Sequence, residues 1–202
     1  MGVLDDLIRK KDKNTAELGV PNLDEFVIFR NEKGEERKLS KAEWRKSYLH
    51  QRLVQAVNSQ NSQNLFLELY DNLQLEFYKD SIAYAKKLYE WERASDRSIY
   101  IYARILIEMQ EMDKAETLLM EGIVRFPDME LFYSLFSRVF YIKRDLKKSE
   151  EFLWKALRLN PNEKESLQWL EIAYGEDAFI NLLHEVAKLP NSWWAPLVLV
   201  SC

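Results

Sequence analysis

The sequence predicts an all-α chain of stacked helix–turn–helix units, a right-handed solenoid, with a small β-hairpin and a capping helix near its N-terminus. Three observations carry this prediction. Pro127 and Pro161 lie 34 residues apart, and the windows that end on them align position by position. A period of this length is typical of paired helices that bury their apolar faces only by stacking. Five glycines and five prolines in 202 residues also suit a mostly helical chain.

Composition narrows the function classes. Hydrophobic residues make up 47% of the chain, which is ample for a core, and the net charge is −4. A chain without an overall positive field is not built to recruit nucleic acid, and the lysines and arginine at positions 143, 144, 147 and 148 are those of a solvated turn. The single cysteine, Cys202, forms no disulfide within the chain. With no signal-peptide pattern at the N-terminus and no long apolar run, we expect a cytoplasmic protein.

The N-terminal part, residues 1–61, contains a short amphipathic helix within 1–22 and then a β-hairpin. Residues 26–29 are Phe-Val-Ile-Phe, and Asn31 to Gly34 supply turn residues before a second strand at 35–39. Ser40 and Glu43 then form a capping box, in which each residue satisfies a backbone amide of the other. The helix that follows has large apolar residues on one side: Trp44, Tyr48, Leu49, Leu53 and Val57.

Residues 62–190 divide into four repeat units: 62–95, 96–129, 130–163 and 164–190. The first lacks the closing proline, and the last is shortened because Gly175 ends its first helix. Small side chains recur where the second helix of a unit must approach the first closely, at Ser81, Ala115 and Ser149. Two further packing positions repeat later in the second helix, at Ala85, Leu119, Leu153 and at Leu88, Gly122, Ala156.

These residues resemble the tetratricopeptide repeat family. The unit 130–163 matches its pattern through Tyr133, Phe136, Ser137, Phe140, Leu153, Ala156 and Pro161. The unit 96–129 matches through Ile99, Tyr102, Ala103, Leu106, Ala115, Leu119 and Pro127. The resemblance implies antiparallel helix pairs whose first helices line a concave groove that holds another polypeptide. The wider layout is similar to a group of bacterial tetratricopeptide proteins with no assigned activity.

The chain departs from the family at the turn between the two helices of a unit. This turn usually holds a glycine, which tolerates a positive φ, but Gln110 and Arg144 stand there instead. We expect these turns to be either strained or differently shaped.

The C-terminal end, residues 191–202, is apolar and carries no charge from Trp193 onward. Too few residues follow Pro196 for a stable helix of their own. The segment must fold back onto the third unit, be covered by a second copy of the chain, or represent a truncated next repeat. We expect self-association through this end, since an exposed apolar patch with two tryptophans favours it.

The sequence shows no catalytic or cofactor chemistry. His50 and His184 each stand alone, and His184 lacks the second histidine of the zinc-protease helix pattern, so no metal site is expected. The chain has no glycine-rich phosphate loop and no nucleophile elbow. We therefore expect a protein that is not an enzyme.

Groove-lining positions instead carry the candidate binding residues. Stacking places Arg104 and Arg138 side by side, where two guanidiniums near tyrosines suit an acidic peptide or a C-terminal carboxylate. The partner-binding residues predicted in this way are Phe66, Tyr70, Tyr100, Arg104, Arg138 and Tyr141. Domains of this family that clamp chaperone C-termini carry Asn at the arginine position, so that role is not implied here.

Three alternatives stay open. The first is a scaffold that binds a protein or peptide in its groove, and the second is a module that assembles with copies of itself. In the third, Arg104 and Arg138 pair with acids of the groove such as Glu108 and bind no ligand.

Overall fold

The computed structural model describes residues 26–30, 34–93 and 95–201. These residues form ten helices and a single two-stranded sheet, so the all-α prediction is confirmed. The predicted helix within 1–22, most of the hairpin turn and Cys202 lie outside the described residues. The chain divides into two units, residues 1–52 and residues 53–202, which are described separately below.

The first unit contains the predicted hairpin and capping box. Strand β1 (Phe26–Arg30) runs antiparallel to β2 (Glu36–Ser40), with Phe26 opposite Ser40. Helix α2 (Lys41–Asn58) follows directly. Its first turn is capped reciprocally: the Glu43 amide donates to Ser40 Oγ at 3.2 Å, and the Ser40 amide donates to Glu43 Oε2 at 2.9 Å. The Ser40 hydroxyl, which donates to Glu43 Oε2 at 2.7 Å, and the Ser40 amide hold the pKa of the Glu43 carboxyl below its usual value.

Two aromatic residues of α2 are more exposed than their spacing suggested. Trp44 and Tyr48 stack on each other with ring centroids 5.3 Å apart, and both are exposed. Leu53, which begins the second unit, is fully buried instead. Stacking removes part of each ring from water, and the rest of both rings stays accessible.

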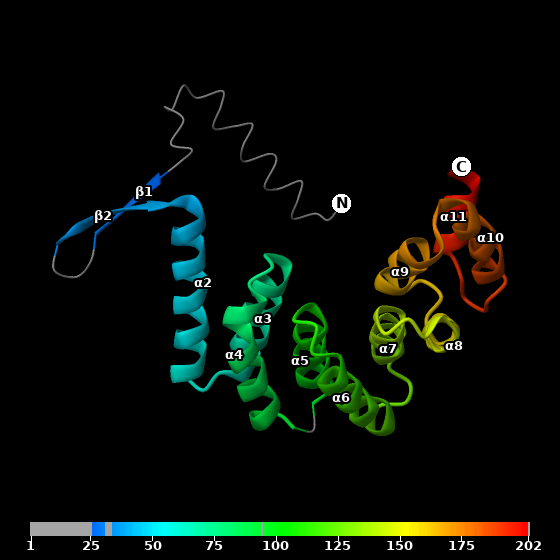
Figure 1. Cartoon of the computed structure of the whole chain (residues 1–202), viewed down its shortest axis with the longest axis horizontal. Coiled ribbons are helices and arrows are strands. Elements are labelled where there is room, and N and C mark those ends of the chain that lie inside the picture. The colour runs from blue at the N-terminus through cyan, green and yellow to red at the C-terminus, as the bar shows by residue number, and fades with distance from the viewer. Residues whose placement is uncertain (1–25, 31–33, 94, 202) are drawn as a thin grey trace. The chain divides into compact units, whose positions relative to one another are not determined.

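The second unit consists of antiparallel helix pairs (Figure 1). First helices begin at Ser62, Asp96, Glu130 and Lys164, which are 34 residues apart. They are α3 (Ser62–Gln74), α5 (Asp96–Glu108), α7 (Glu130–Ile142) and α9 (Lys164–Tyr174). Their second helices are α4 (Tyr78–Trp91), α6 (Met112–Arg125), α8 (Leu146–Leu159) and α10 (Glu176–Ala187).

Small side chains lie where the helices of this unit approach most closely. Ser81, Ala115 and Ser149 are buried, and Ser149 Oγ lies 3.2 Å from Ser137 Oγ on the facing helix α7. At Gly122, an added Cβ would lie 3.1 Å from Ile99 Cγ2 and 3.2 Å from the ring of Phe132. Both neighbours are fully buried, so the contact has little room to relax.

The C-terminal end forms a helix, contrary to expectation. Helix α11 (Trp194–Ser201) includes Pro196, and Ala195, Val198 and Leu199 pack with Leu183 and Val186 of α10. Asn162 Oδ1 accepts hydrogen bonds from the amides of Trp193 and Trp194, at 2.9 and 3.0 Å. A helix this short is unstable in isolation. Burial against α10 and the Asn162 side chain, which accepts from its first amides, stabilise it.

The turns within units are strained rather than differently shaped. Glu76, Gln110 and Arg144 occupy the same place in successive units, and their φ angles are 64°, 61° and 66°. The Gln110 turn keeps regular closing bonds, since the Glu111 amide donates to the Leu106 carbonyl at 2.9 Å. The left-handed conformation is therefore retained without the glycine that adopts it at no steric cost.

Replacing these residues by glycine should stabilise the fold. We expect Gln110→Gly and Arg144→Gly each to raise the free energy of unfolding by roughly 0.5–1 kcal/mol, because relief of left-handed strain exceeds the entropy cost of glycine. Urea denaturation followed by circular dichroism measures the change. Gln110→Ala, which keeps a Cβ, is the matched control and should give no gain; an equal gain from alanine would show that the turn is unstrained.

Candidate interaction groove

One position of each first helix builds the row predicted to face the groove: Tyr70 on α3, Arg104 on α5, Arg138 on α7 and Ile172 on α9. The two ends of this row are open, since Tyr70 is 41% exposed and Ile172 is 62% exposed. In the middle, the side chains of Arg104 and Arg138 are only 21% and 22% exposed. The row therefore offers aromatic and apolar surface at its ends and a partly shielded charged centre.

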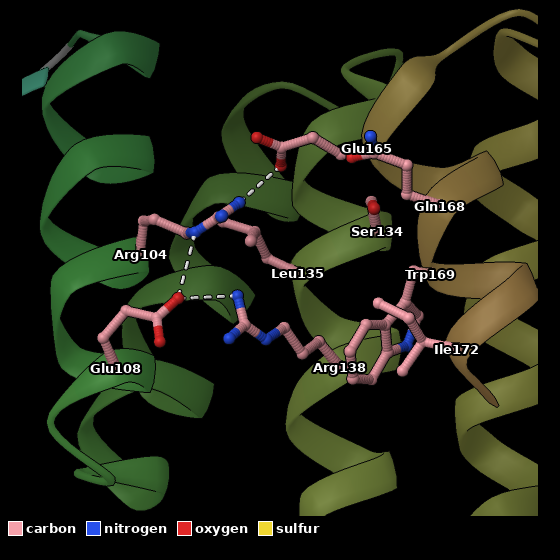
Figure 2. A pocket seen from close by; sticks show the side chains of 9 residues that line it. All are labelled: Arg104, Glu108, Ser134, Leu135, Arg138, Glu165, Gln168, Trp169 and Ile172. Carbon is pink, nitrogen blue, oxygen red and sulfur yellow. Dashed lines mark hydrogen bonds and ion pairs between the residues drawn. The ribbon is translucent and has the colours of Figure 1, made fainter. Parts of the chain in front are cut away.

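The charged centre is a chain of ion pairs between two guanidiniums and two carboxylates (Figure 2). Arg104 Nη1 lies 2.6 Å from Glu165 Oε2, and Arg138 Nη1 lies 2.8 Å from Glu108 Oε1. Arg104 Nε also approaches Glu108 Oε1 at 3.5 Å, so Glu108 links the two arginines. The sequence predicted that the arginines lie side by side. Their ion pairs with Glu108 are those of the alternative in which the arginines pair with acids of the groove itself. The two arginines and two glutamates together carry no net charge.

Tyr100 joins this network from the core of the helix stack. Its hydroxyl donates to Glu165 Oε1 at 3.0 Å, and the residue is only 7% exposed. The prediction that Tyr100 occupies an exposed groove position was therefore wrong: the ring is core, and only its hydroxyl reaches the network. Burial, reinforced by the Glu165 carboxylate, raises the pKa of Tyr100 well above its usual value, so the hydroxyl keeps its proton and acts as a donor.

The pKa of Arg104 responds to the same surroundings. Burial acts to lower it, but the carboxylates of Glu165 and Glu108 outweigh that effect and raise it. Arg104 is thus a permanent cation held between two acids. Glu165 is fixed in turn by its helix, because the side chain of the buried Glu163 caps α9 and accepts from the Glu165 amide at 2.8 Å.

The remaining predicted residues lie on either side of this centre. Phe66 is half-buried, 6.4 Å from the ring of Tyr70. Tyr141 packs edge-on against Trp169 with centroids 5.2 Å apart. Leu73 and Ile107, the counterparts of Tyr141 in the first two units, are buried in the core.

A hollow of about 250 Å³ lies among α5, α7 and α9. We call it the central hollow. Ser134 and Leu135 of α7 contribute to it between the charged side chains of α5 and the residues of α9, as Figure 2 shows. Its lining residues are Arg104, Glu108, Ser134, Leu135, Arg138, Glu165, Gln168, Trp169 and Ile172.

Glu165 and Trp169 were missed by sequence reasoning. The guanidinium of Arg138 lies over the ring of Trp169, 5.5 Å from its centroid, so this tryptophan is part of the charged centre. Neither residue occupies the repeat position that predicted the arginines. No periodic signal points to Glu165, because it lies in the fourth unit whereas Arg104 lies in the second.

Metal chemistry and membrane insertion find no support in the part of the chain that the structure describes. No group of three or more His, Cys, Asp or Glu side chains there is arranged to hold a metal ion, and His184 is exposed on α10. Among these same residues, no helix combines the length and the apolar character needed to cross a bilayer.

Comparisons with known proteins show the fold. No protein-family model and no curated protein matches this sequence. Among solved structures, the chain is similar to the type III secretion translocator chaperone SycD of Yersinia enterocolitica, in an alternative dimer form, with a TM-score of 0.51 and 16% identity. The similarity covers 64% of this chain and 96% of the SycD chain. At this identity the two chains share a helical-repeat fold, and the likeness carries no further conclusion.

Removing an arginine from the network should cost stability. We expect Arg104→Ala to lower the free energy of unfolding by roughly 1–3 kcal/mol, because it leaves the partly buried Glu165 carboxylate without its cation, while Glu108 keeps only Arg138. Thermal and urea unfolding measure this change. Arg158→Ala, at an exposed position of α8, is the control and should change stability by less than about 0.5 kcal/mol. Equal behaviour of the two variants would mean that the network contributes nothing to folding.

Proposed function

We propose that this protein is an interaction scaffold that holds a partner polypeptide on the groove formed by its first helices. The observation that carries the proposal is the groove row itself, in which exposed Tyr70 and Ile172 flank a hollow with a charged rim. Binding hot spots of protein interfaces are enriched in aromatic residues and arginine. The helical-repeat fold shared with a secretion chaperone agrees with a surface for protein binding.

The groove favours a partner of mixed character. Tyr70, Trp169 and Ile172 provide apolar and aromatic contacts, whereas Arg104 and Arg138 provide donors for acidic groups. We infer that the partner presents an extended segment with apolar side chains beside a carboxylate. Because the arginines already face two glutamates, charge alone does not attract this segment, and apolar contact supplies most of the affinity.

Affinity capture tests this function. We expect the wild-type chain to retain a defined partner from a lysate of its own organism, and the double variant Tyr70→Ala/Ile172→Ala to lose it. Both side chains are exposed, so their removal weakens binding while leaving the unfolding transition unchanged. The partner, once identified by mass spectrometry, is then titrated in purified form by calorimetry.

The matched control for this capture is Met120→Ala/Val124→Ala, which removes exposed apolar side chains from the second helix α6 instead. Retention of the same partner by the groove double variant, or its loss by the α6 control, would contradict binding in the groove.

A second candidate function is self-assembly through the C-terminal end. Helix α11 buries only part of its apolar surface, and Trp193, Leu197 and Val200 are 60%, 60% and 89% exposed. A cluster of this kind at the end of a repeat array favours association with a second copy. The similar SycD chain is itself described as a dimer.

Sedimentation velocity over a range of concentrations tests self-assembly. We expect the chain to shift from monomer to dimer or larger species as its concentration rises. The triple variant Trp193→Ser/Leu197→Ser/Val200→Ser should remain monomeric, since it removes exposed apolar area without touching Ala195, Val198 or Leu199, which anchor α11. A wild-type chain that stays monomeric at high concentration would remove the support for this candidate.

A further inference from the structure

The contact between Glu165 and α5 skips a repeat unit. Glu165 belongs to the fourth unit, yet it pairs with Arg104 and Tyr100 of the second. In stacked repeats each unit ordinarily contacts only its neighbours. The intervening unit leaves room because Ser134, the counterpart of Tyr100 one period later, is small and buried. The Glu165 carboxylate of the fourth unit therefore reaches across the groove to a site on the second unit.

The site that holds this carboxylate is built on one helix. Tyr100 and Arg104 are four residues apart on α5, so their side chains leave the same face. The tyrosine hydroxyl donates to Oε1 of Glu165 and Arg104 Nη1 donates to Oε2, which gives a two-point receptor for a carboxylate. We call this pair the α5 cradle. Tyr100 is locked in the core, so the cradle persists whether or not α9 supplies the anion.

The cradle opens onto the central hollow, whose opposite side is apolar. Glu165 is the more exposed member of the ion pair, with its side chain 31% exposed compared with 21% for Arg104. Leu135, Trp169 and Ile172 line the hollow near it. Arg138 Nε is a buried donor that makes no hydrogen bond within the described part of the chain, so the donors of the site are not all used by the two glutamates. A carboxylate attached to an apolar group fits both features.

We propose that the α5 cradle is a binding site for a carboxylate of the partner and that Glu165 is its internal competitor. This inference rests on the proposed groove function and adds the ligand chemistry to it. A partner segment places its carboxylate on Tyr100 and Arg104 in exchange for that of Glu165, and its neighbouring apolar side chain covers Leu135, Trp169 and Ile172. The carboxylate comes either from a chain terminus or from an Asp or Glu side chain, which share this chemistry.

A competitor that occupies its site reduces the apparent affinity of a ligand by the fraction of time for which the site is free. If Glu165 fills the cradle for about nine-tenths of the time, removing it tightens ligand binding about tenfold. A merely structural ion pair behaves differently, because its loss leaves ligand affinity unchanged or lowers it through disorder of the groove. The direction of the change in affinity therefore separates the two roles.

The experiment titrates three short probes into the full chain and follows the indole N–H signal of Trp169 by nuclear magnetic resonance. The first probe is acetyl-Gly-Ser-Gly-Leu with a free C-terminal carboxylate, the second is its C-terminal amide, and the third is acetyl-Gly-Glu-Gly-Leu amide. The proteins are wild type, Glu165→Gln, Glu165→Ala and the control Glu171→Gln, which changes an exposed acid on the same helix. Thermal unfolding of each variant confirms that it is folded.

We expect the free-carboxylate probe or the glutamate probe to bind Glu165→Gln and Glu165→Ala about tenfold more tightly than wild type. Glu171→Gln should match wild type, and the uncharged amide should bind the two Glu165 variants more weakly than the acidic probes do. The stronger of the two acidic probes identifies the source of the carboxylate. Adding Tyr100→Phe to Glu165→Gln should reverse the gain, because it removes one of the two donors.

Three results would overturn the internal-competitor role. These are equal affinity in wild type and both Glu165 variants, equal binding of the amide and acid probes, or no shift of the Trp169 signal at millimolar probe in any folded variant. None of them bears on partner capture through Tyr70 and Ile172. Failure of that capture, with a gain for the Glu165 variants intact, would instead contradict the wider groove function.

Discussion

The structure depends on one constraint: a pair of short helices cannot bury its apolar face without another pair beside it. The constraint is met by close approach between helices, which requires small side chains at the crossing points. Gly122 illustrates how little space is left, because a Cβ there would press on two fully buried side chains, Ile99 and Phe132. The period of 34 residues is visible in these contacts, since the small residues Ser81, Ala115 and Ser149 lie one period apart in successive units.

Stacking in register also places equivalent residues of the first helices next to one another. Arg104 and Arg138 are neighbours for this reason, and two adjacent cations in a partly shielded groove require compensation. Glu108 provides it from the helix that carries Arg104, and Glu165 provides it from two units away. The groove is thus neutral at its centre. Its surface chemistry is mainly that of apolar contact, and the charged groups have a secondary part.

Helix α11 covers the C-terminal end of the repeat array only in part. At the C-terminal end, α11 covers α10, and Asn162 caps the start of α11 from the turn that opens the fourth unit. The cover is partial, because one side of α11 stays exposed. The groove row lies on the first helices α3, α5, α7 and α9, whereas this exposed side belongs to α11.

Sequence alone determined the repeat architecture, the hairpin, the capping box and the adjacency of the two arginines. Each of these follows from local chemistry or from strict periodicity: Ser40 and Glu43 cap over three residues, and any residue is brought beside its counterpart one period later. Sequence also identified Gln110 and Arg144 as residues poorly suited to their turns. It left open whether the backbone would keep the left-handed conformation at these turns, and the positive φ angles of Gln110 and Arg144 show that it does.

Only the tertiary structure decided which groove residues are free. Tyr100 is buried and Tyr70 is exposed, although both were predicted from groove-facing positions. Glu165 reaches Arg104 across a whole unit, and that distance depends on how tightly successive pairs stack, which no periodic pattern encodes. The helix at the C-terminal end is also a tertiary outcome. Its eight residues are too few to hold a helix alone, and burial on α10 with a cap from Asn162 stabilises it.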